Sequence, residues 1–489
     1  MHEPSFGEFR RLSRGANVIP VYKQISADLD TPVSAFLKLK KNDYAFLLES
    51  VEGREKTARY SFLGSNPSVI FKSKGRNIEI IRSGGKNVKR FVCAKDPLDE
   101  IQKIMKDFRA ARVRGLPRFY GGFVGYMGYD MVRFFEKLPD KNPDELKLPD
   151  SVFMLTDSVL AFDHVNHTIK IIVNVILRNN KGSLSKAYSE AVKKADSIER
   201  ELMKPLAKAK GRKCKRKAKI VSNFRKSEFE GMVRKAKEYI RFGDIIQVVP
   251  SQRFKVKIEK DPLDIYRRLR SLNPSPYMFF LKLRDAIIAG ASPEMLVRCE
   301  EGLVETRPIA GTRPRGRDQK EDIRLEKELL NDKKEKAEHI MLVDLGRNDL
   351  GRVCRKGRVR VSEFMRVERY SHVMHLVSDV EGELDNKYDI YDCLRACFPA
   401  GTVSGSPKIR AMEIIDELEN TRRGPYAGCV GYFSFSHNMD TCITIRTVVI
   451  KGGMGYVQAG GGVVADSVPE KEYFESVNKA KALIEAIVN

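Results

Sequence analysis

The stretch that decides the fold spans residues 440–459, DTCITIRTVVIKGGMGYVQA. It contains two runs rich in β-branched and aromatic residues, 440–450 and 454–459, a composition typical of β-strands. Only residues 451–453 separate them, and so short a loop can join antiparallel strands but cannot form the crossover between parallel strands. Another very short connection lies at Leu281–Asp285. The sequence therefore predicts large antiparallel sheets.

Helical patterns alternate with strands in the second half of the chain and are scarcer in the first half. Helices are predicted at 96–110, 183–203, 226–241, 262–271, 319–347, 387–395, 407–419 and 469–488. Further strands are predicted at 45–50, 60–63, 77–81, 119–124, 152–162, 168–177, 245–254, 277–282, 286–290, 302–307, 373–383 and 427–435. We expect an α+β fold in which large antiparallel β-sheets pack against helices.

A basic segment separates the two halves. Residues 204–219 contain seven Lys and two Arg and no acid, a composition that favours a solvated linker. We predict an amino-terminal region at 1–203, a basic linker at 204–224 and a carboxyl-terminal region at 225–489.

The net charge of +24 raises the question of nucleic acid binding. Part of this charge is confined to the basic segment, and no helix-turn-helix, zinc-finger or RNA-binding motif accompanies it. We expect no nucleic acid partner, although a basic surface would attract a dianionic metabolite or an acidic protein.

The amino terminus and the apolar runs bear on the cellular compartment. MHEPSFGEFRRLSRG, residues 1–15, lacks the apolar core of a secretory signal. The longest apolar run, 171–177, is interrupted by Asn174 and is too short to span a bilayer. We expect a cytoplasmic protein without a membrane segment.

Two helices carry acidic residues that deserve a functional interpretation. Glu335, Glu338 and His339 fall at i, i+3 and i+4 and share one helix face, with an apolar side expected at Ile340, Met341 and Leu345. Glu475 and Lys479 lie one turn apart on the last helix. Solvent-facing acids and an ordinary salt bridge would produce the same patterns. Two glutamates from separate helices also suit Mg²⁺, which prefers oxygen ligands.

Three glycine-rich clusters lie in the same half of the chain, at 308–314 (PIAGTRP), 401–408 (GTVSGSPK) and 458–464 (QAGGGVV). Glycine lets backbone N–H groups approach an anion, although a tight turn without a ligand would need it too. Together with Arg446, Lys479 and the acidic helices, they indicate a site for a carboxylated ligand bridged by a divalent ion.

A family resemblance rests on seven separated motifs: PIAGTRPRG, EHIMLVDLGRNDLGR, SHVMHLVS, GTVSGSPK, TCITIRTVVI, VQAGGGVVADSVPEKE and NKA. In order and spacing they are similar to the motifs of the chorismate-utilising enzymes. Within that family the chain resembles the large subunit, component I, of anthranilate synthases. The match covers about 225–489 and, more loosely, about 18–177, where LLES and RYSFLG carry it. The resemblance implies a layered β-sandwich core.

The resemblance also assigns site residues. It implies that Glu338 and Glu475 hold Mg²⁺, which binds the ring carboxylate of chorismate, and that Glu335 protonates the departing C4 hydroxyl. His375 would transfer the proton that accompanies pyruvate loss, although His372 competes and a structural role is common for such a histidine. Thr402 joins this catalytic set. The implied chorismate contacts are Gly311, Thr312, Tyr432, Arg446, Gly460, Gly461, Gly462 and Lys479.

Two positions distinguish reactions within the family. Component I of aminodeoxychorismate synthase, the alternative interpretation, commonly has Lys where this chain has Ala310, and alanine cannot attack the ring. Isochorismate and salicylate synthases commonly have a water-activating Lys where this chain has Gln247, whose amide does not titrate. The resemblance therefore implies a carbon–oxygen lyase that aminates chorismate and releases pyruvate to give anthranilate, the first step of tryptophan biosynthesis.

The source of ammonia implies a partner. No nucleophile elbow G-x-C-x-G with a downstream His-x-Glu is present in the sequence. The resemblance therefore implies a separate glutamine amidotransferase subunit, component II, in a heterotetramer of two large and two small subunits.

Regulation is implied by two further motifs, LLES at 47–50 and NPSPYMFF at 273–280. They resemble the tryptophan pocket of feedback-inhibited members, although a strand end and a filled core would explain them separately. The residues implied for this pocket are Glu49, Ser50, Pro276, Tyr277 and Met278, with Glu49 expected as the partner of the amine.

Overall fold

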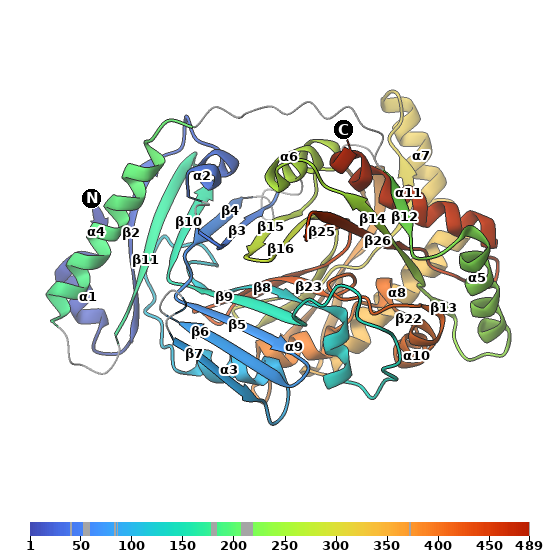
Figure 1. Cartoon of the computed structure of the whole chain (residues 1–489), viewed down its shortest axis with the longest axis horizontal. Helices are drawn as coiled ribbons and strands as arrows, with labels where there is room; N and C mark the ends of the chain where they lie inside the picture. Colours follow the sequence, from blue (N-terminus) through green and yellow to red (C-terminus); the bar gives the residue numbers. More distant parts are fainter. Residues whose placement is uncertain are drawn as a thin grey trace.

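Two large antiparallel sheets dominate the computed structural model of the chain (Figure 1). The structure describes residues 1–39, 42–51, 59–82, 85, 87–177, 183–206, 219–370 and 373–488. Every strand pairing within this part of the chain is antiparallel, apart from one isolated parallel bridge between Val18 and Ala110. The predicted α+β class with large antiparallel sheets is confirmed.

The first sheet has twelve strands in the described residues, and both halves of the chain contribute to it. In spatial order they are β1 (His2–Glu3), β2 (Val18–Ser26), β11 (Thr168–Ile176), β10 (Ser158–Asp163), β4 (Tyr60–Ser65), β3 (Tyr44–Glu49), β15 (Tyr277–Leu283), β16 (Ala286–Ser292), β25 (Thr447–Lys451), β26 (Met454–Gly460), β14 (Ser251–Lys257) and β12 (Ile220–Ser222).

The second sheet also has twelve strands within the described ranges. Along its main path lie β19 (Ile309–Pro314), β21 (Val373–Leu384), β18 (Leu303–Thr306), β17 (Met295–Glu300), β24 (Met439–Ile443), β23 (Cys429–Ser434), β8 (Gly122–Met127), β9 (Ser151–Thr156), β5 (Val69–Lys74), β6 (Asn77–Arg82) and β7 (Asn87–Val92). The long strand β20 (Cys354–Arg369) pairs with β21, and a small separate sheet joins β13 (Gln247–Val248) to β22 (Gly405–Ser406).

The chain crosses between the two sheets where single strands were predicted. The expected strand 440–450 is two strands, because β24 lies in the second sheet and β25 lies in the first. Arg446 in the connection has φ 51°, a left-handed conformation that interrupts the strand. In the same way the expected strand 152–162 divides into β9 and β10, which belong to different sheets. The short loop 451–453 does join the hairpin β25–β26, as predicted.

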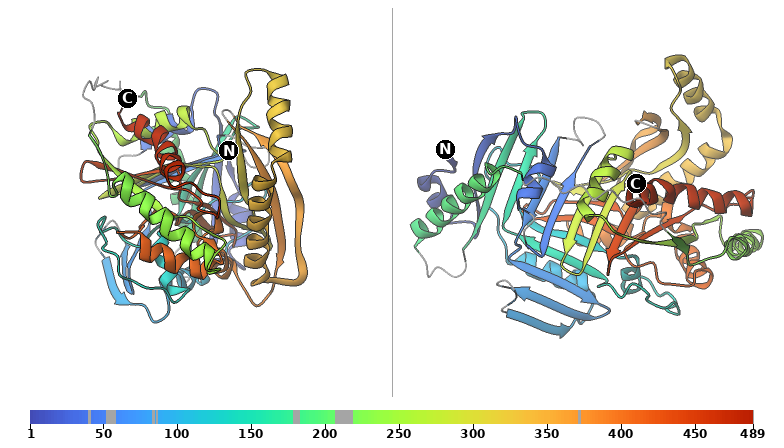
Figure 2. Two further views of the ribbon diagram at one scale, coloured as in Figure 1. Left: turned by 90° about the vertical axis from the view of Figure 1, so that its right-hand side faces the viewer. Right: turned by 45° about the horizontal axis from the view of Figure 1, so that its top comes forward.

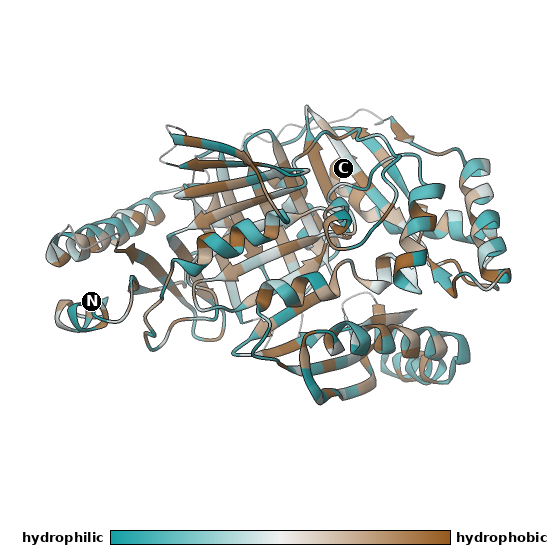
Figure 3. Ribbon diagram, turned by 90° about the horizontal axis from the view of Figure 1, so that it is seen from below, coloured by the Kyte–Doolittle hydropathy of each residue, from teal (hydrophilic) through white to brown (hydrophobic). Residues whose placement is uncertain are grey.

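The sheets face one another across an apolar core, as predicted for a layered β-sandwich (Figure 2). Aromatic rings from both layers meet there. The ring centroids of Phe62 (β4) and Tyr432 (β23) are 6.2 Å apart, and those of Phe119 and Tyr432 are 4.4 Å apart. A second apolar cluster covers the other face of the first sheet. Figure 3 shows hydrophobic residues along the strands and mixed faces on the peripheral helices.

The helices in the described residues surround these layers. They are α1 (Phe6–Leu12), α2 (Pro32–Leu39), α3 (Pro97–Lys106), α4 (Leu184–Leu202), α5 (Lys226–Arg241), α6 (Pro262–Leu272), α7 (Gln319–Asn331), α8 (Lys333–Gly351), α9 (Ile390–Cys397), α10 (Lys408–Leu418) and α11 (Pro469–Val488), with 3₁₀ turns η2 (Tyr129–Phe134) and η3 (Gly401–Val403). None of them is long and apolar enough to cross a membrane.

The predicted helix 319–347 is two helices. Asp332 ends α7 in an extended conformation, and its carboxylate accepts hydrogen bonds from the backbone N–H groups of Lys334 and Glu335, which start α8. The predicted apolar side of α8 is wrong at Ile340, which is 45 % exposed. The helix instead buries His339, Leu342, Val343, Gly346 and Leu350.

The predicted regions 1–203 and 225–489 contribute strands to both sheets. Residues 207–218 of the predicted basic linker lie outside the described residues. The division at 204–224 stays a prediction.

Candidate active site

Helix α8 presents acidic side chains toward the small sheet β13–β22. The amide Nε2 of Gln247 in β13 donates to Glu338 Oε1 over 3.0 Å. Glu335, one turn earlier, receives a weaker contact from Arg313 Nη1 at 3.4 Å. Burial raises the pKa of Glu335, and the charge of Glu338 raises it further. His339, expected on the same face, is instead fully buried and its ring shares a hydrogen bond of 2.6 Å with Ser378 Oγ.

The glycines after β26 form the floor beneath these acids. A Cβ atom at Gly462 would lie 2.5 Å from Gln247 Nε2 and 3.8 Å from Glu338 Oε1. A Cβ atom at the neighbouring Gly461 would lie 3.5 Å from Glu475 Oε1. Because the two positions are consecutive, the carboxylates of Glu338 and Glu475 converge on the same backbone segment. Glycine is needed here because a side chain would fill the space between them.

Helix α11 supplies the other charged groups. Lys479 Nζ lies 2.8 Å from Glu475 Oε1, the i,i+4 salt bridge expected from the sequence, and donates to the carbonyl oxygen of Gly460 at 3.1 Å. Glu472, one turn before Ser476, is buried, and its Oε2 has no hydrogen-bond partner among the described residues. Burial raises the pKa of Glu472, and the charge of Glu475 adds to this. The helix therefore brings two carboxylates and one amine to the glycine floor.

Strands β19 and β21 pair Thr312 with His375, where β19 bulges at Gly311. The Nδ1 atom of His375 lies 3.0 Å from the carbonyl oxygen of Gly311 and 3.0 Å from Thr312 Oγ1. Gly311 has φ 65°, and a Cβ there would lie 3.2 Å from Glu335 Oε2. Glycine is needed at this position because it adopts a positive φ without strain and because a Cβ would crowd the Glu335 carboxylate. The competing His372 lies outside the described residues.

Arg446 brings positive charge to the same region. The half-buried residue has no carboxylate partner in the described part of the chain, and burial lowers the pKa of its guanidinium. The pKa of His375 is lowered by burial and also by the charge of Arg446, which places the two side chains close together. A guanidinium without a counter-ion in such a place suits a carboxylate ligand.

Glu294 is a buried acid that the sequence analysis did not select. It lies at the start of β17 and is 7 % exposed. Burial raises its pKa to about 8, partly offset by the Thr402 hydroxyl, the Ile309 amide and the charge of Lys479. A carboxyl group with this pKa is mostly protonated at neutral pH. The only signal in the sequence was its place after Pro293, next to a predicted strand end.

Tyr432 lies apart from the other predicted substrate contacts. It belongs to β23, pairs with Asp440, and its ring packs against Phe119 between the sheets, in a separate cavity. The alternation of side chains along β23 turns it away from the glycine floor. Tyr426 lies there instead, because its hydroxyl contacts the backbone amide of Gly460.

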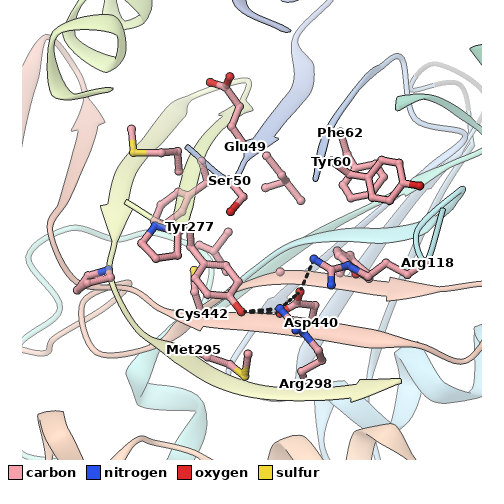
Figure 4. A pocket seen from close by; sticks show the side chains of 18 of the residues that line it. Glu49, Ser50, Tyr60, Phe62, Arg118, Tyr277, Met295, Arg298, Asp440 and Cys442 are labelled. Atoms are coloured by element: carbon pink, nitrogen blue, oxygen red, sulfur yellow. Dashed lines mark hydrogen bonds and ion pairs between the residues drawn. The ribbon is translucent and has the colours of Figure 1, made fainter. Parts of the chain in front are cut away.

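The separate cavity lies at the ends of β3 and β15, and its empty volume, including the space open to solvent, is about 710 Å³ (Figure 4). All five residues predicted to bind the inhibitor line this cavity, so the structure brings them together. Tyr277 donates to Asp440 at 3.0 Å, and Arg298 pairs with Asp440 at 3.1 Å. Ser50 Oγ is buried and has no hydrogen-bond partner in the described residues.

The side chain of Glu49 does not point toward the charged floor of this cavity (Figure 4). Its carboxylate accepts a hydrogen bond from Tyr266 and pairs with Arg270 at 3.4 Å, both on α6. Strand alternation explains this, since Glu49 follows Leu48 on the opposite face of β3. This orientation does not support the expected contact of Glu49 with an amine.

The comparisons with known proteins agree with this architecture. Residues 44–485 match the family described as chorismate binding enzyme. The chain is 50 % identical to anthranilate synthase component 1 of Acetivibrio thermocellus, covering 100 % of this chain and 99 % of the relative. It is 52 % identical to that of Aquifex aeolicus (strain VF5), covering 99 % and 97 %. The crystal structure of anthranilate synthase component I from Streptococcus pneumoniae TIGR4 superposes with a TM-score of 0.78 at 38 % identity, covering 94 % of this chain and 99 % of that one.

The chain therefore belongs to the chorismate-binding enzyme family. It is an enzyme of this family, and the relatives that match it over the full length are named anthranilate synthase component 1.

Proposed function

We propose that the chain is component 1 of an anthranilate synthase, which aminates chorismate with ammonia and eliminates pyruvate to give anthranilate. The observation that carries this proposal is the convergence of the carboxylates of Glu338 and Glu475 on Gly461 and Gly462, in the region to which Arg446, without a carboxylate partner among the described residues, brings positive charge. Such a site suits a dicarboxylate bound partly through a cation. The names of the relatives and their full-length coverage support the same reaction.

The donor set fits Mg²⁺. The atoms that converge here are carboxylate oxygens, and Glu472 Oε2 is a buried oxygen without a partner among the described residues. No three His, Cys, Asp or Glu side chains of the described residues are grouped closely enough to hold an ion alone, so substrate and water would complete its shell. Glu338 and Glu475 would hold Mg²⁺, whose bound charge neutralises and orients a substrate carboxylate.

Glu294 is the better candidate to protonate the departing C4 hydroxyl. With a pKa raised to about 8 it keeps its proton at neutral pH, and it lies beside Thr402 and Lys479. Glu335, which was expected in this role, also has a pKa raised by burial and by the charge of Glu338, and the charge of Arg313 offsets part of that rise. We therefore assign the proton donor to Glu294 and an electrostatic role to Glu335.

His375 is suited to accept a proton during pyruvate loss. Since the carbonyl of Gly311 can only accept, Nδ1 must carry the hydrogen, which leaves Nε2 as the basic atom. The lowered pKa keeps the ring neutral at physiological pH. Gly311 thus fixes the tautomer that a base requires.

Ala310 and Gln247 favour amination with aromatisation over the other reactions of the family. Ala310 is buried in β19 and offers no amine to the ring. Gln247 occupies the wall of the site with an amide that cannot activate water. Aminodeoxychorismate synthase component I remains the second candidate, and product chromatography distinguishes the two. Incubation with chorismate, Mg²⁺ and ammonium should yield anthranilate and pyruvate; 4-amino-4-deoxychorismate as the end product would refute the proposal.

The proposal includes a partner and a regulator. A glutamine amidotransferase, component 2, would supply ammonia in a cytoplasmic heterotetramer of two large and two small subunits, since the relatives' name implies a second component. Tryptophan would bind the cavity at Ser50, where a buried hydroxyl and the guanidinium groups of Arg118 and Arg298 meet apolar walls. Inhibition requires that tryptophan bind the less active state more tightly.

A further inference from the structure

The buried guanidinium of Arg423 lies next to the candidate active site and takes no direct part in the chemistry assigned to it. Arg423 follows α10 and is 2 % exposed. Its Nη2 atom donates to the carboxylate of Glu419 at 2.6 Å, and its Nε atom donates to the same carboxylate at 3.0 Å. We call these two residues the Arg423–Glu419 pair. Figure 1 shows α10 together with β13 and β22 at one end of the molecule.

The Arg423–Glu419 pair joins two backbone segments that are far apart in the sequence. Arg423 Nη1 donates to the carbonyl oxygen of Val403 at 2.7 Å, and Nη2 donates to the carbonyl oxygen of Val249 at 2.6 Å. The carboxylate of Glu419 accepts from the backbone N–H of Ser251 at 2.9 Å and from its hydroxyl at 2.7 Å. All three nitrogen atoms of the guanidinium are therefore used, and two of them bind main-chain carbonyl groups.

Both segments lead directly to groups of the candidate site. Val403 follows Thr402, which lies beside Glu294, the assigned proton donor. The other segment begins with Gln247, whose amide donates to Glu338 at 3.0 Å. The positions of these side chains relative to one another thus depend on how the two segments are held together.

The second segment also supports the glycine floor. Val248 and Val463 exchange backbone hydrogen bonds of 3.2 and 2.8 Å, directly after Gly462. Ser251 pairs with Gly460 where β14 and β26 meet. A displacement of this segment would therefore displace the floor on which the carboxylates of α8 and α11 converge.

The contacts of Arg423 require the shape of a guanidinium as well as its charge. A buried ion pair alone is a weak source of stability, because removing two charges from water can cost as much as their attraction contributes. A planar guanidinium can bind two carbonyl groups and a carboxylate at once, whereas the ammonium group of lysine is a single point of charge. The rings of Tyr129 and Tyr426 fix its orientation, since their centres lie 4.8 and 5.5 Å from its central carbon.

We propose that Arg423 is a positioning residue of this enzyme, which through Val249 and Val403 sets the distance between the proton donor and the glycine floor. This inference rests on the proposed function. Because the side chain is buried, it acts through backbone atoms and not by contact with the substrate. Such distances matter, since a misplacement of about 1 Å can cost about 10²-fold in rate.

Arg423→Lys and Glu419→Gln test the proposal. Arg423→Lys keeps the charge and loses the simultaneous contacts to two carbonyl groups, and Glu419→Gln removes the charge that orients the guanidinium. Arg395→Lys is the matched control, because Arg395 is a partly buried arginine that pairs with Asp96 and Asp392 at 3.1 Å and joins α9 to the start of α3.

Two kinds of measurement separate a positioning role from a purely structural one. The values of kcat and of KM for chorismate are measured with saturating Mg²⁺ and ammonium, and kcat is referred to the folded fraction of each preparation. Hydrogen–deuterium exchange is measured, without substrate, for peptides that cover 245–251 and 401–408. Loss of stability alone would reduce the folded fraction and would leave kcat and KM of the folded molecules as they are.

We expect kcat/KM of Arg423→Lys to fall about tenfold or more, with KM raised and kcat lowered, and both peptides to exchange faster. Glu419→Gln should change the same quantities in the same direction, and it decides alone if Arg423→Lys does not fold. Arg395→Lys should keep kcat, KM and the exchange of both peptides. Unchanged kcat and KM in the folded variants of the pair overturn the proposal. If the unsubstituted chain makes no anthranilate, the proposed function fails instead, and unchanged exchange in both peptides would then overturn the positioning role.

Discussion

His375 donates its Nδ1 hydrogen to the carbonyl oxygen of Gly311 across 3.0 Å, which leaves Nε2 as the basic atom of the ring. His375→Asn should keep a donor near Gly311 but remove the base. Pyruvate release should slow by about 10²-fold or more, while amination slows less, so that an aminated intermediate accumulates. Rapid-quench chromatography detects it. If chorismate consumption and pyruvate release slow equally and no intermediate appears, His375 does not have this role.

Glu294→Gln should reduce turnover by about 10²-fold or more, because the amide cannot donate the carboxylic proton. In the unsubstituted enzyme the protonated form is active, so turnover should fall as pH rises through about 8, the raised pKa of Glu294. The pH profile must be measured at constant free ammonia. Glu335→Gln is the matched comparison: a larger loss there than in Glu294→Gln would return the proton donor to Glu335.

The same carboxyl group predicts a pH-dependent stability. Its pKa is raised in the folded state, so the folded chain holds a proton that the unfolded chain releases. Its contribution to stability is therefore lost as pH rises toward and through about 8. As pH increases from 5 to about 8, the denaturation midpoint of the unsubstituted protein should fall relative to that of Glu294→Gln. A difference independent of pH would show that folding does not raise the pKa of Glu294.

Glu338→Gln should weaken Mg²⁺ use, since a neutral amide binds the ion less strongly than a carboxylate. The Mg²⁺ concentration for half-maximal turnover should rise by about tenfold or more. Glu470→Gln on α11, an exposed acid paired with Lys226, is the control and should leave the Mg²⁺ titration unchanged. Equal titration curves for both variants would remove Glu338 from the metal site.

Ser50→Phe should abolish inhibition by tryptophan and leave turnover near normal, because the larger ring fills the cavity behind the buried Ser50 hydroxyl. The chain contains no tryptophan, so the fluorescence of the added amino acid reports its binding without background. Binding and inhibition should disappear together. Retained binding with retained inhibition would show that tryptophan acts elsewhere.

The antiparallel fold could be predicted because a three-residue connection such as 451–453 permits only one kind of pairing. The point at which a strand passes from one sheet to the other could not be predicted. The left-handed conformation of Arg446 marks that point, and no residue pattern in 440–450 indicates it. Strand β20 was missed because half of the residues in CRKGRVRVSEFMRVER are charged. It is a strand because its backbone pairs with β21; some of its charges are exposed, and others, such as Arg366, form ion pairs.

The candidate site shows the same limit. Motif spacing was enough to bring together Glu338, Glu475, Gly461 and Gly462. Burial is a property of the whole fold, so the raised pKa of Glu294 could not be predicted from its neighbours in sequence. The family resemblance indicated Tyr432 on β23 and did not indicate Tyr426, which precedes that strand and contacts the backbone amide of Gly460.

The most direct test of the central claim is the fluorescence of anthranilate formed by the purified chain from chorismate and ammonium, with and without Mg²⁺ and with and without tryptophan. We predict emission that requires Mg²⁺, persists without the amidotransferase component and falls when tryptophan is added. Chorismate consumption that yields no anthranilate under these conditions would contradict the assigned reaction.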